Sequence, residues 1–391
     1  MQFKQEHKIY FIFSFWILVL IVGIATTLYT NRTVTHNYYD AALDWLNHTD
    51  MYNSQGAGFI YFPQSAIFYI PLAKIPFWLS EIIWRALNFF IILYGSWSYM
   101  KLISANKNQY VLALFVLSAL FLPTMFSSFQ MGQMNLTIIA LSLLSMLAIE
   151  KDQFKLAAFL IILCLAFKPT TIVIVLLFAY FYPKMRISML IATLFFVLLP
   201  FLTTFDWHYV IYEYQQCYIK LTTASDVGNN YSTQWSQIFN VFDLITNSHV
   251  SDLVQRIVRL IAALIVLGAL IKAYKETKNT HLFLWTLYAL FSSYLMVFNP
   301  RTENTDYCIV TIAIAVFCIF NLAHKKYFTA AILVLINIGI LVASNISKVF
   351  TPENDHWFTP IMALIFFIYI IIISLAKNSV IKMPNAINVE K

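Results

Sequence analysis

Long apolar runs recur along almost the whole chain, and they limit its fold more than any single motif does. The runs cover residues 9–29, 78–100, 109–125, 134–149, 155–168, 171–182, 186–204, 254–273, 281–298, 306–322, 326–345 and 358–376. A helix needs roughly 20 apolar residues to cross a bilayer, whereas membrane barrels show alternating segments of about 10 residues, which are missing here. With 60% hydrophobic and 11% charged residues, the chain does not have the composition of a soluble domain. We predict an all-α polytopic membrane protein with about 12 transmembrane helices, forming one domain over residues 1–391.

The distribution of charge predicts how these helices are oriented. If the runs alternate across the membrane, the segments on the side of the N-terminus hold 16 of the 25 basic residues and 5 of the 18 acidic ones. Lys and Arg favour cytoplasmic flanks, so both termini are expected in the cytoplasm and the protein in the cytoplasmic (inner) membrane. The net charge of +7 then fits anionic lipid rather than nucleic acid. The run at 9–29 is too long for a typical signal-peptide core and is interpreted as a permanent span.

This orientation places five polar segments on the extracytoplasmic face. They are Asn31–Phe77, Phe126–Gln133, Asp206–Leu253, Asn299–Thr305 and Ser344–Trp357. Within the first, residues 61–77 are apolar but contain three prolines and a lysine, so we interpret them as a juxtamembrane helix or a segment that dips into the membrane and returns. Because most loop length lies on this face, we expect the chemistry there, with segments 31–77 and 206–253 as its main parts.

Polar residues at the outer ends of the runs are the candidate site. Ionisable residues at membrane depth are candidates for function, and Lys168 and Arg301 are predicted on the same face as Asp40. Two cations and a carboxylate suit a phosphate-bearing substrate and a general base, so Asp40 is the candidate catalytic residue. The candidate substrate- and donor-binding residues are Arg301, Lys168, Arg85, Glu303, Asn304, Gln133, Asn135, Tyr61 and Gln64. Neither the carboxylates nor the four cysteines have metal-site spacing, and no metal or cofactor is expected.

Each candidate also has a structural interpretation. Asp40 and Asp44, four residues apart, can be the wet face of an interfacial helix whose apolar residues Tyr38, Ala41, Ala42 and Trp45 touch lipid. Arg301 can pair with Glu303 to clamp a loop.

The remaining candidates have similar alternatives. Lys168 can be an anchor that extends its ammonium to the membrane surface. Gln133 and Asn135 can bond neighbouring helices, as polar residues in membranes often do.

Six motifs in order resemble one known family. They are YYDAALDWLNHTDMY from Tyr38, GFIYFPQSAIFYIPLAKIP from Gly58, GQMN from Gly132, FKPT from Phe167, NNYSTQWSQIF from Asn229 and NPRTEN from Asn299. Over residues 38–307 the chain resembles glycosyltransferase family 87. The resemblance implies a GT-C bundle with extracytoplasmic active-site loops. It also implies transfer of a hexose, often mannose, from a polyprenyl-phosphate carrier to a glycolipid or glycan acceptor, with inversion and without a nucleotide-sugar donor.

One departure from the family concerns the base. Many members place a catalytic Asp a few residues before the Tyr-rich pair, where this chain has Val34, Thr35 and His36, and Asp40 is assigned in its place. We expect Asp40 to take the acceptor proton, and Arg301, with Lys168 and Arg85, to neutralise the leaving phosphate.

Two other functions stay open. A transporter or flippase for a lipid-linked sugar often has internal repeats, which are not evident in this sequence, and polar residues at mid-membrane. An inactive membrane scaffold is the other alternative, because of the missing Asp.

Overall fold

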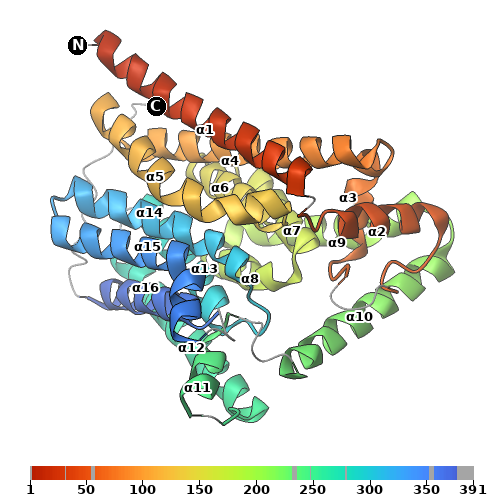
Figure 1. The fold of residues 1–391 in the computed structure, drawn as a ribbon. Helices are drawn as coiled ribbons and strands as arrows, with labels where there is room; N and C mark the ends of the chain where they lie inside the picture. Colours follow the sequence, from red (N-terminus) through yellow and green to blue (C-terminus); the bar gives the residue numbers. More distant parts are fainter. Residues whose placement is uncertain are drawn as a thin grey trace. The chain divides into compact units, whose positions relative to one another are not determined.

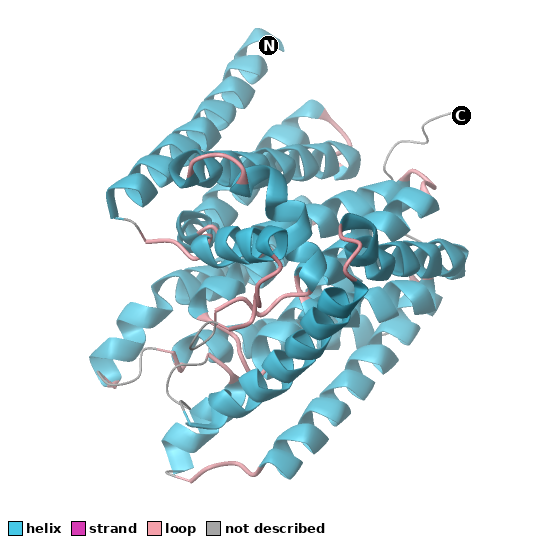
Figure 2. Cartoon of the chain, turned by 90° about the vertical axis from the view of Figure 1, so that its right-hand side faces the viewer, coloured by secondary structure: helices cyan, strands magenta, loops and turns pink. Residues whose placement is uncertain are grey.

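The chain folds into helices joined by turns and loops. The computed structural model describes residues 2–30, 32–53, 58–230, 236–246, 248–277, 280–351 and 356–376. Within these ranges there are sixteen α-helices and three short 3₁₀ helices, and no strand (Figures 1 and 2). A helix satisfies its backbone hydrogen bonds within itself, which is what a chain of apolar runs requires in lipid. The predicted all-α membrane class is confirmed.

Nine helices of the described ranges are long and apolar enough to cross a membrane. They are α1 (Gln2–Thr30), α4 (Phe77–Ile103), α5 (Lys107–Met131), α9 (Arg186–Thr203), α12 (Asp252–Glu276), α13 (Thr280–Phe298), α14 (Cys308–Ala323), α15 (Tyr327–Phe350) and α16 (Phe358–Leu375). The spans of α9 and α14 include the 3₁₀ turns that precede them, η2 (Pro183–Met185) and η3 (Asn304–Tyr307). Three shorter apolar helices are α6 (Asn135–Glu150), α7 (Phe154–Phe167) and α8 (Ile172–Phe181), which follows η1 (Pro169–Thr171). Each predicted span is therefore a helix, and the number of crossings stays a prediction.

Contacts divide the chain into two compact units. The first unit contains residues 1–17, 97–125 and 231–391, and the second contains residues 18–96 and 126–230. Helices α1, α4 and α5 contribute residues to both.

The first unit is built around α13. This helix packs against α12, α14 and α16, while α15 packs against α14 and α16. Nearly every residue of α13 is buried, from Leu282 to Phe298. A helix that is apolar on all sides is expected inside a bundle, and the sequence of α13 has this property.

The second unit joins two short helices to membrane-length ones. Helix α2 (His36–Asn47) packs against α3 (Pro63–Ala73), α3 against α9, and α6 and α9 against α7. The apolar face of α2, formed by Tyr38, Ala41, Ala42 and Trp45, is at most 2% exposed. These residues contact protein, so the alternative in which they touch lipid is wrong.

Residues 61–77 form the short helix that was expected. Helix α3 begins at Pro63, which suits the first position of a helix because its missing N–H has no partner there. With 11 residues it is too short to cross a bilayer. Its position relative to the membrane stays a prediction.

Several predicted loops are partly helical. Residues 206–253, interpreted as a loop, contain α10 (Trp207–Asn230) and α11 (Ile238–Thr246). Helix α5 continues through the predicted segment 126–133 as far as Met131, and α15 continues to Phe350. Polar residues do not end a helix when their side chains find partners, as Ser128 of α5 does with Gln133 at 3.2 Å.

Candidate active site

The turn between α5 and α6 carries two of the predicted residues. Gly132 lies in this turn with a φ of 67°, a left-handed conformation that glycine adopts without strain. Asn135 begins α6, and its Nδ2 donates to Gln133 Oε1 at 2.7 Å and to Ser128 Oγ at 3.3 Å. Both Asn135 and Gln133 are buried. Because the amide nitrogen of Asn135 is used in this way, its oxygen faces the other direction.

Lys168 donates a hydrogen bond to the side-chain oxygen of Asn135. It follows the last residue of α7 with an extended backbone (φ −145°, ψ 110°), and Pro169 then begins η1. Lys168 Nζ donates to Asn135 Oδ1 at 2.7 Å. The structure therefore brings together Lys168, Asn135 and Gln133, which the GQMN and FKPT motifs contribute. Lys168 is thus a cation at a break between apolar helices, and its ammonium donates to a buried amide.

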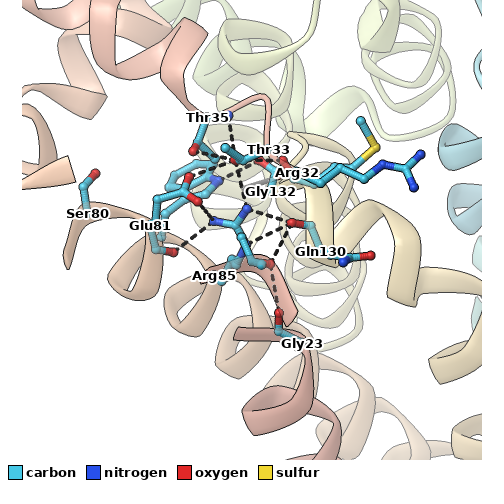
Figure 3. A network of polar contacts seen from close by, with 12 residues as sticks. Gly23, Arg32, Thr33, Thr35, Ser80, Glu81, Arg85, Gln130 and Gly132 are labelled. Carbon is cyan, nitrogen blue, oxygen red and sulfur yellow. Dashed lines mark hydrogen bonds and ion pairs between the residues drawn. The ribbon is translucent and has the colours of Figure 1, made fainter. Parts of the chain in front are cut away.

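Arg85 lies beneath the same turn. It is 2% exposed and pairs with Glu81, which is 4% exposed, at 3.1 Å (Figure 3). Its other contacts are with the backbone oxygens of Glu81 (3.2 Å) and Gln130 (2.8 and 3.3 Å) and with Thr33 Oγ1 (3.0 Å). These five contacts match the five N–H groups of a guanidinium. Arg85 is therefore saturated within the protein, which does not support the predicted contact with a donor phosphate.

Gln64 and Tyr61 lie near α10. Gln64 is buried, and its Nε2 donates to the backbone oxygen of Phe196 at 2.7 Å and to Tyr214 Oη at 2.6 Å. The Tyr61 hydroxyl is 3.3 Å from that of Tyr38. These contacts connect the start of α3 with α9, α10 and α2. Sugar contacts by Gln64 and Tyr61 stay a prediction.

Asp40 lies on the exposed face of α2. Partial burial raises the pKa of its carboxyl, nearby His36 lowers it and Asp44 raises it. Asp44, on the next turn, accepts a hydrogen bond from Thr49 Oγ1 at 2.8 Å. Asp40 is thus accessible, with a pKa shifted toward neutrality, as a general base requires.

Glu213 of α10 is a buried carboxyl that the sequence analysis did not single out. It is 0% exposed, and its Oε2 accepts a long hydrogen bond of 3.4 Å from the Met51 backbone N–H. Its Oε1 has no hydrogen-bond partner among the described residues. Burial raises the pKa of Glu213 to about 8, and Asp50 contributes in the same direction. The buried residues Tyr209, Glu213 and Cys217 recur every four positions, a helical spacing that was visible in the sequence.

The predicted residues of the first unit lie in the turn after α13. Arg301 is half-buried there, and Glu303 caps η3. Asn304 Oδ1 accepts from Ser236 Oγ at 2.5 Å and from Thr359 Oγ1 at 2.9 Å, and Asn304 Nδ2 lies 2.9 Å from His356 Nδ1. The NPRTEN motif thus contacts Ser236 in the described part of the NNYSTQWSQIF motif. Tyr231 of that motif, an aromatic residue suited to stacking on a sugar, lies outside the described residues. Arg301 and Lys168 belong to different units, and their cooperation stays a prediction.

No metal site is evident in the described part of the chain. Groups of three or more His, Cys, Asp or Glu residues that could hold an ion do not occur there.

The sequence matches glycosyltransferase family 87 over residues 59–300, more than half of the 391 residues. No curated protein matches the chain significantly. The matched range includes the Gly132 turn and the break at Lys168, which the structure brings together. The chain therefore belongs to glycosyltransferase family 87 and is a multi-pass membrane glycosyltransferase.

Proposed function

We propose that this enzyme transfers a hexose, mannose-like, from a polyprenyl-phosphate carrier to a glycolipid or glycan acceptor at the extracytoplasmic face of the cytoplasmic membrane. The observation that carries the proposal is the ammonium of Lys168, held 2.7 Å from Asn135 Oδ1 at a helix break in the family-matched range. A cation placed between apolar helices suits a phosphate that arrives on a lipid, because charge-assisted hydrogen bonds to phosphate are strong. Family membership supports the transfer of a sugar rather than its transport.

Asp40 acts as the general base in this proposal. Its carboxylate takes the proton of an acceptor hydroxyl while that oxygen attacks the anomeric carbon. The bond from the anomeric carbon to the phosphate oxygen breaks, the polyprenyl phosphate leaves with the bonding electrons, and the configuration inverts. The exposure of Asp40 and its raised pKa support this role.

Lys168 and Arg301 balance the charge of the departing phosphate. Stabilising charge that develops in the transition state is usually the largest catalytic contribution, so both cations are expected to affect turnover. Asn135 holds Lys168 and is itself oriented by Gln133, while Tyr61, Gln64, Glu303 and Asn304 are the proposed surroundings of the sugar and phosphate. Arg85, whose donors are all used internally, is not assigned a contact with the donor.

The test is transfer by purified protein in lipid nanodiscs, supplied with labelled polyprenyl-phosphate hexose and a crude lipid acceptor. Asp40→Asn is expected to lower turnover by about 10²–10⁴-fold, the usual contribution of a general base. Asp44→Asn is the matched control on the same helix, since asparagine can still accept the Thr49 hydrogen bond.

Lys168→Ala is expected to raise KM for the donor and lower kcat, with the exposed Lys155→Ala at the other end of α7 as control. Wild-type turnover in both Asp40→Asn and Lys168→Ala would reject the assignment. Redistribution of the labelled donor across the membrane without a new glycosidic bond would indicate a transporter instead.

A further inference from the structure

The Glu81–Arg85 pair lies under the site rather than in it. Both side chains belong to α4, one helical turn apart, and both are almost completely buried. Burying two charges is costly even when they pair, and such a pair is not in itself a sign of stability. The groups that Glu81 and Arg85 contact therefore indicate what the ion pair does.

The pair and its neighbours hold three consecutive carbonyl groups. Arg85 donates to the oxygen of Gln130, the Val34 N–H donates to that of Met131 at 3.0 Å, and Trp84 Nε1 donates to that of Gly132 at 3.0 Å. Thr33 Oγ1 donates to Glu81 Oε1 at 2.9 Å, which connects the segment before α2 to the same pair. Figure 3 shows Glu81, Thr33 and Gln130 around the Arg85 guanidinium. The backbone from 130 to 132 is thereby fixed at every carbonyl.

The fit at Gly132 leaves no room for adjustment. A Cβ atom at this position would lie 2.4 Å from Thr35 Cγ2 and 3.0 Å from Arg85 Nη2. The turn can approach the guanidinium this closely only because residue 132 has no side chain and adopts a positive φ. The turn therefore packs directly against Thr35 and the Arg85 guanidinium.

The same turn orients the group that holds Lys168. Asn135 follows Gly132 by three residues, and its amide is oriented by Gln133 and Ser128 so that Oδ1 faces Lys168 Nζ. A continuous series of contacts thus runs from Glu81 through Arg85, the turn and Asn135 to the ammonium.

We propose that Arg85 and Glu81 are positioning residues for the donor phosphate: they fix the Gly132 turn, which fixes Asn135 and so the ammonium of Lys168. The inference rests on the proposed function for its substrate. Lysine cannot replace Arg85 in this role, because it offers one compact ammonium where the planar guanidinium of Arg85 contacts four acceptors: the Glu81 carboxylate, the backbone oxygens of Glu81 and Gln130, and Thr33 Oγ1. Arg85 makes no contact with the donor and acts through Lys168.

A double-mutant cycle on donor kinetics tests the connection. Arg85→Lys keeps the charge opposite Glu81, and it is expected to raise KM for the donor and lower kcat/KM about tenfold, the size of coupling within one hydrogen-bond network. Asn135→Ala is expected to have an effect at least as large. The double variant should be no worse than Asn135→Ala alone. Fully additive effects would overturn the proposal, as would a loss of Vmax with unchanged KM, which is the result of a smaller folded fraction.

The matched control is Lys272→Arg. Lys272 pairs with Glu276 across one helical turn of α12, so the change is also a cation swap in a pair with i,i+4 spacing. It is expected to leave KM for the donor unchanged. If Arg85→Lys does not yield folded protein, Glu81→Gln replaces it, since it keeps the shape of the side chain and weakens the hold on Arg85.

A second measurement needs no donor. The rate at which acetic anhydride modifies Lys168 is followed by mass spectrometry, and it is expected to rise several-fold in Arg85→Lys and Asn135→Ala as the ammonium loses its fixed acceptor. A rise in Asn135→Ala without one in Arg85→Lys would overturn the connection. Altered modification rates together with a wild-type enzyme that transfers no hexose would reject the proposed function and leave the positioning role supported.

Discussion

Replacing Glu213 by glutamine should stabilise the protein, and the gain should depend on pH. Burial raises the pKa of this carboxyl from an ordinary 4.5 to about 8, so the group is protonated at pH 7 in the folded state. An unfolded chain would ionise it. Each pKa unit corresponds to about 1.36 kcal/mol, so keeping Glu213 neutral at pH 7 costs roughly 3 kcal/mol of unfolding free energy.

Glutamine removes this cost because it is neutral at every pH. Its amide oxygen can still accept from the Met51 N–H, but its amide nitrogen carries two hydrogens where the protonated carboxyl carries one, at a position where Oε1 has no hydrogen-bond partner among the described residues, a loss of about 1 kcal/mol. The net expectation at pH 7 is a gain of about 2 kcal/mol, which for a chain of 391 residues corresponds to an increase in Tm of roughly 2–3 °C.

The pH dependence has a definite sign. The folded state binds more protons than the unfolded state between the two pKa values, so the wild type loses stability as pH rises from about 4.5 to about 8. Glu213→Gln lacks this slope. The difference in Tm between variant and wild type should therefore be absent or reversed near pH 4.5 and largest at pH 8.

Thermal unfolding in detergent, followed by tryptophan fluorescence at pH 4.5, 7 and 8, measures this difference. Glu276→Gln, an exposed carboxyl of α12, is the control and should show no pH-dependent gap. A Tm difference for Glu213→Gln that is the same at all three pH values, or a loss of stability at pH 8, would refute the reasoning from burial.

Two further predictions follow from contacts in the second unit. Gly132→Ala should lower the unfolding free energy by about 2–4 kcal/mol, because alanine is strained at positive φ and its Cβ would overlap Thr35. Gly268→Ala in α12 is the control, since nothing lies within 4 Å of the added Cβ, and it should be neutral or stabilising. Thermal unfolding of both variants measures the difference. Turnover of the wild type should fall as pH decreases, and the midpoint of this fall should lie above the ordinary pKa of an aspartate because the pKa of Asp40 is raised. If the residual turnover of Asp40→Asn has the same midpoint, Asp40 is not the general base.

The sequence was sufficient to predict most of the helices, but it was insufficient to predict which groups their polar side chains contact. Apolar runs such as 281–298 predict α13 almost to the residue, because length and composition alone decide whether a segment can sit in lipid. Helix α10 was missed because its mean hydropathy is low, although Tyr209, Glu213 and Cys217 have the spacing of a buried helical face.

For the candidate site as well, the contacts of single residues could not be predicted from the sequence. Lys168 and Asn135 are 33 positions apart, and nothing in one sequence indicates that their side chains meet. Arg85 was predicted to bind phosphate because it is a charge within an apolar run, yet Glu81, four residues earlier, already offered a partner on the same helix face. A partner one turn away is readable from spacing, whereas a partner on another helix requires the fold.

If the short hairpin of α6 and α7 crosses the membrane as predicted from the sequence, the Asn135–Lys168 contact lies below the level of the lipid headgroups. These helices have 16 and 14 residues, which at about 1.5 Å per residue gives lengths of roughly 21–24 Å, against about 30 Å for a hydrocarbon core. With the charged turn at Lys151 and Asp152 anchored at one interface, the opposite end lies some 6–9 Å short of the other. In that arrangement the bilayer thins there or water enters a depression, and turnover is then expected to vary with the acyl-chain length of the surrounding lipid.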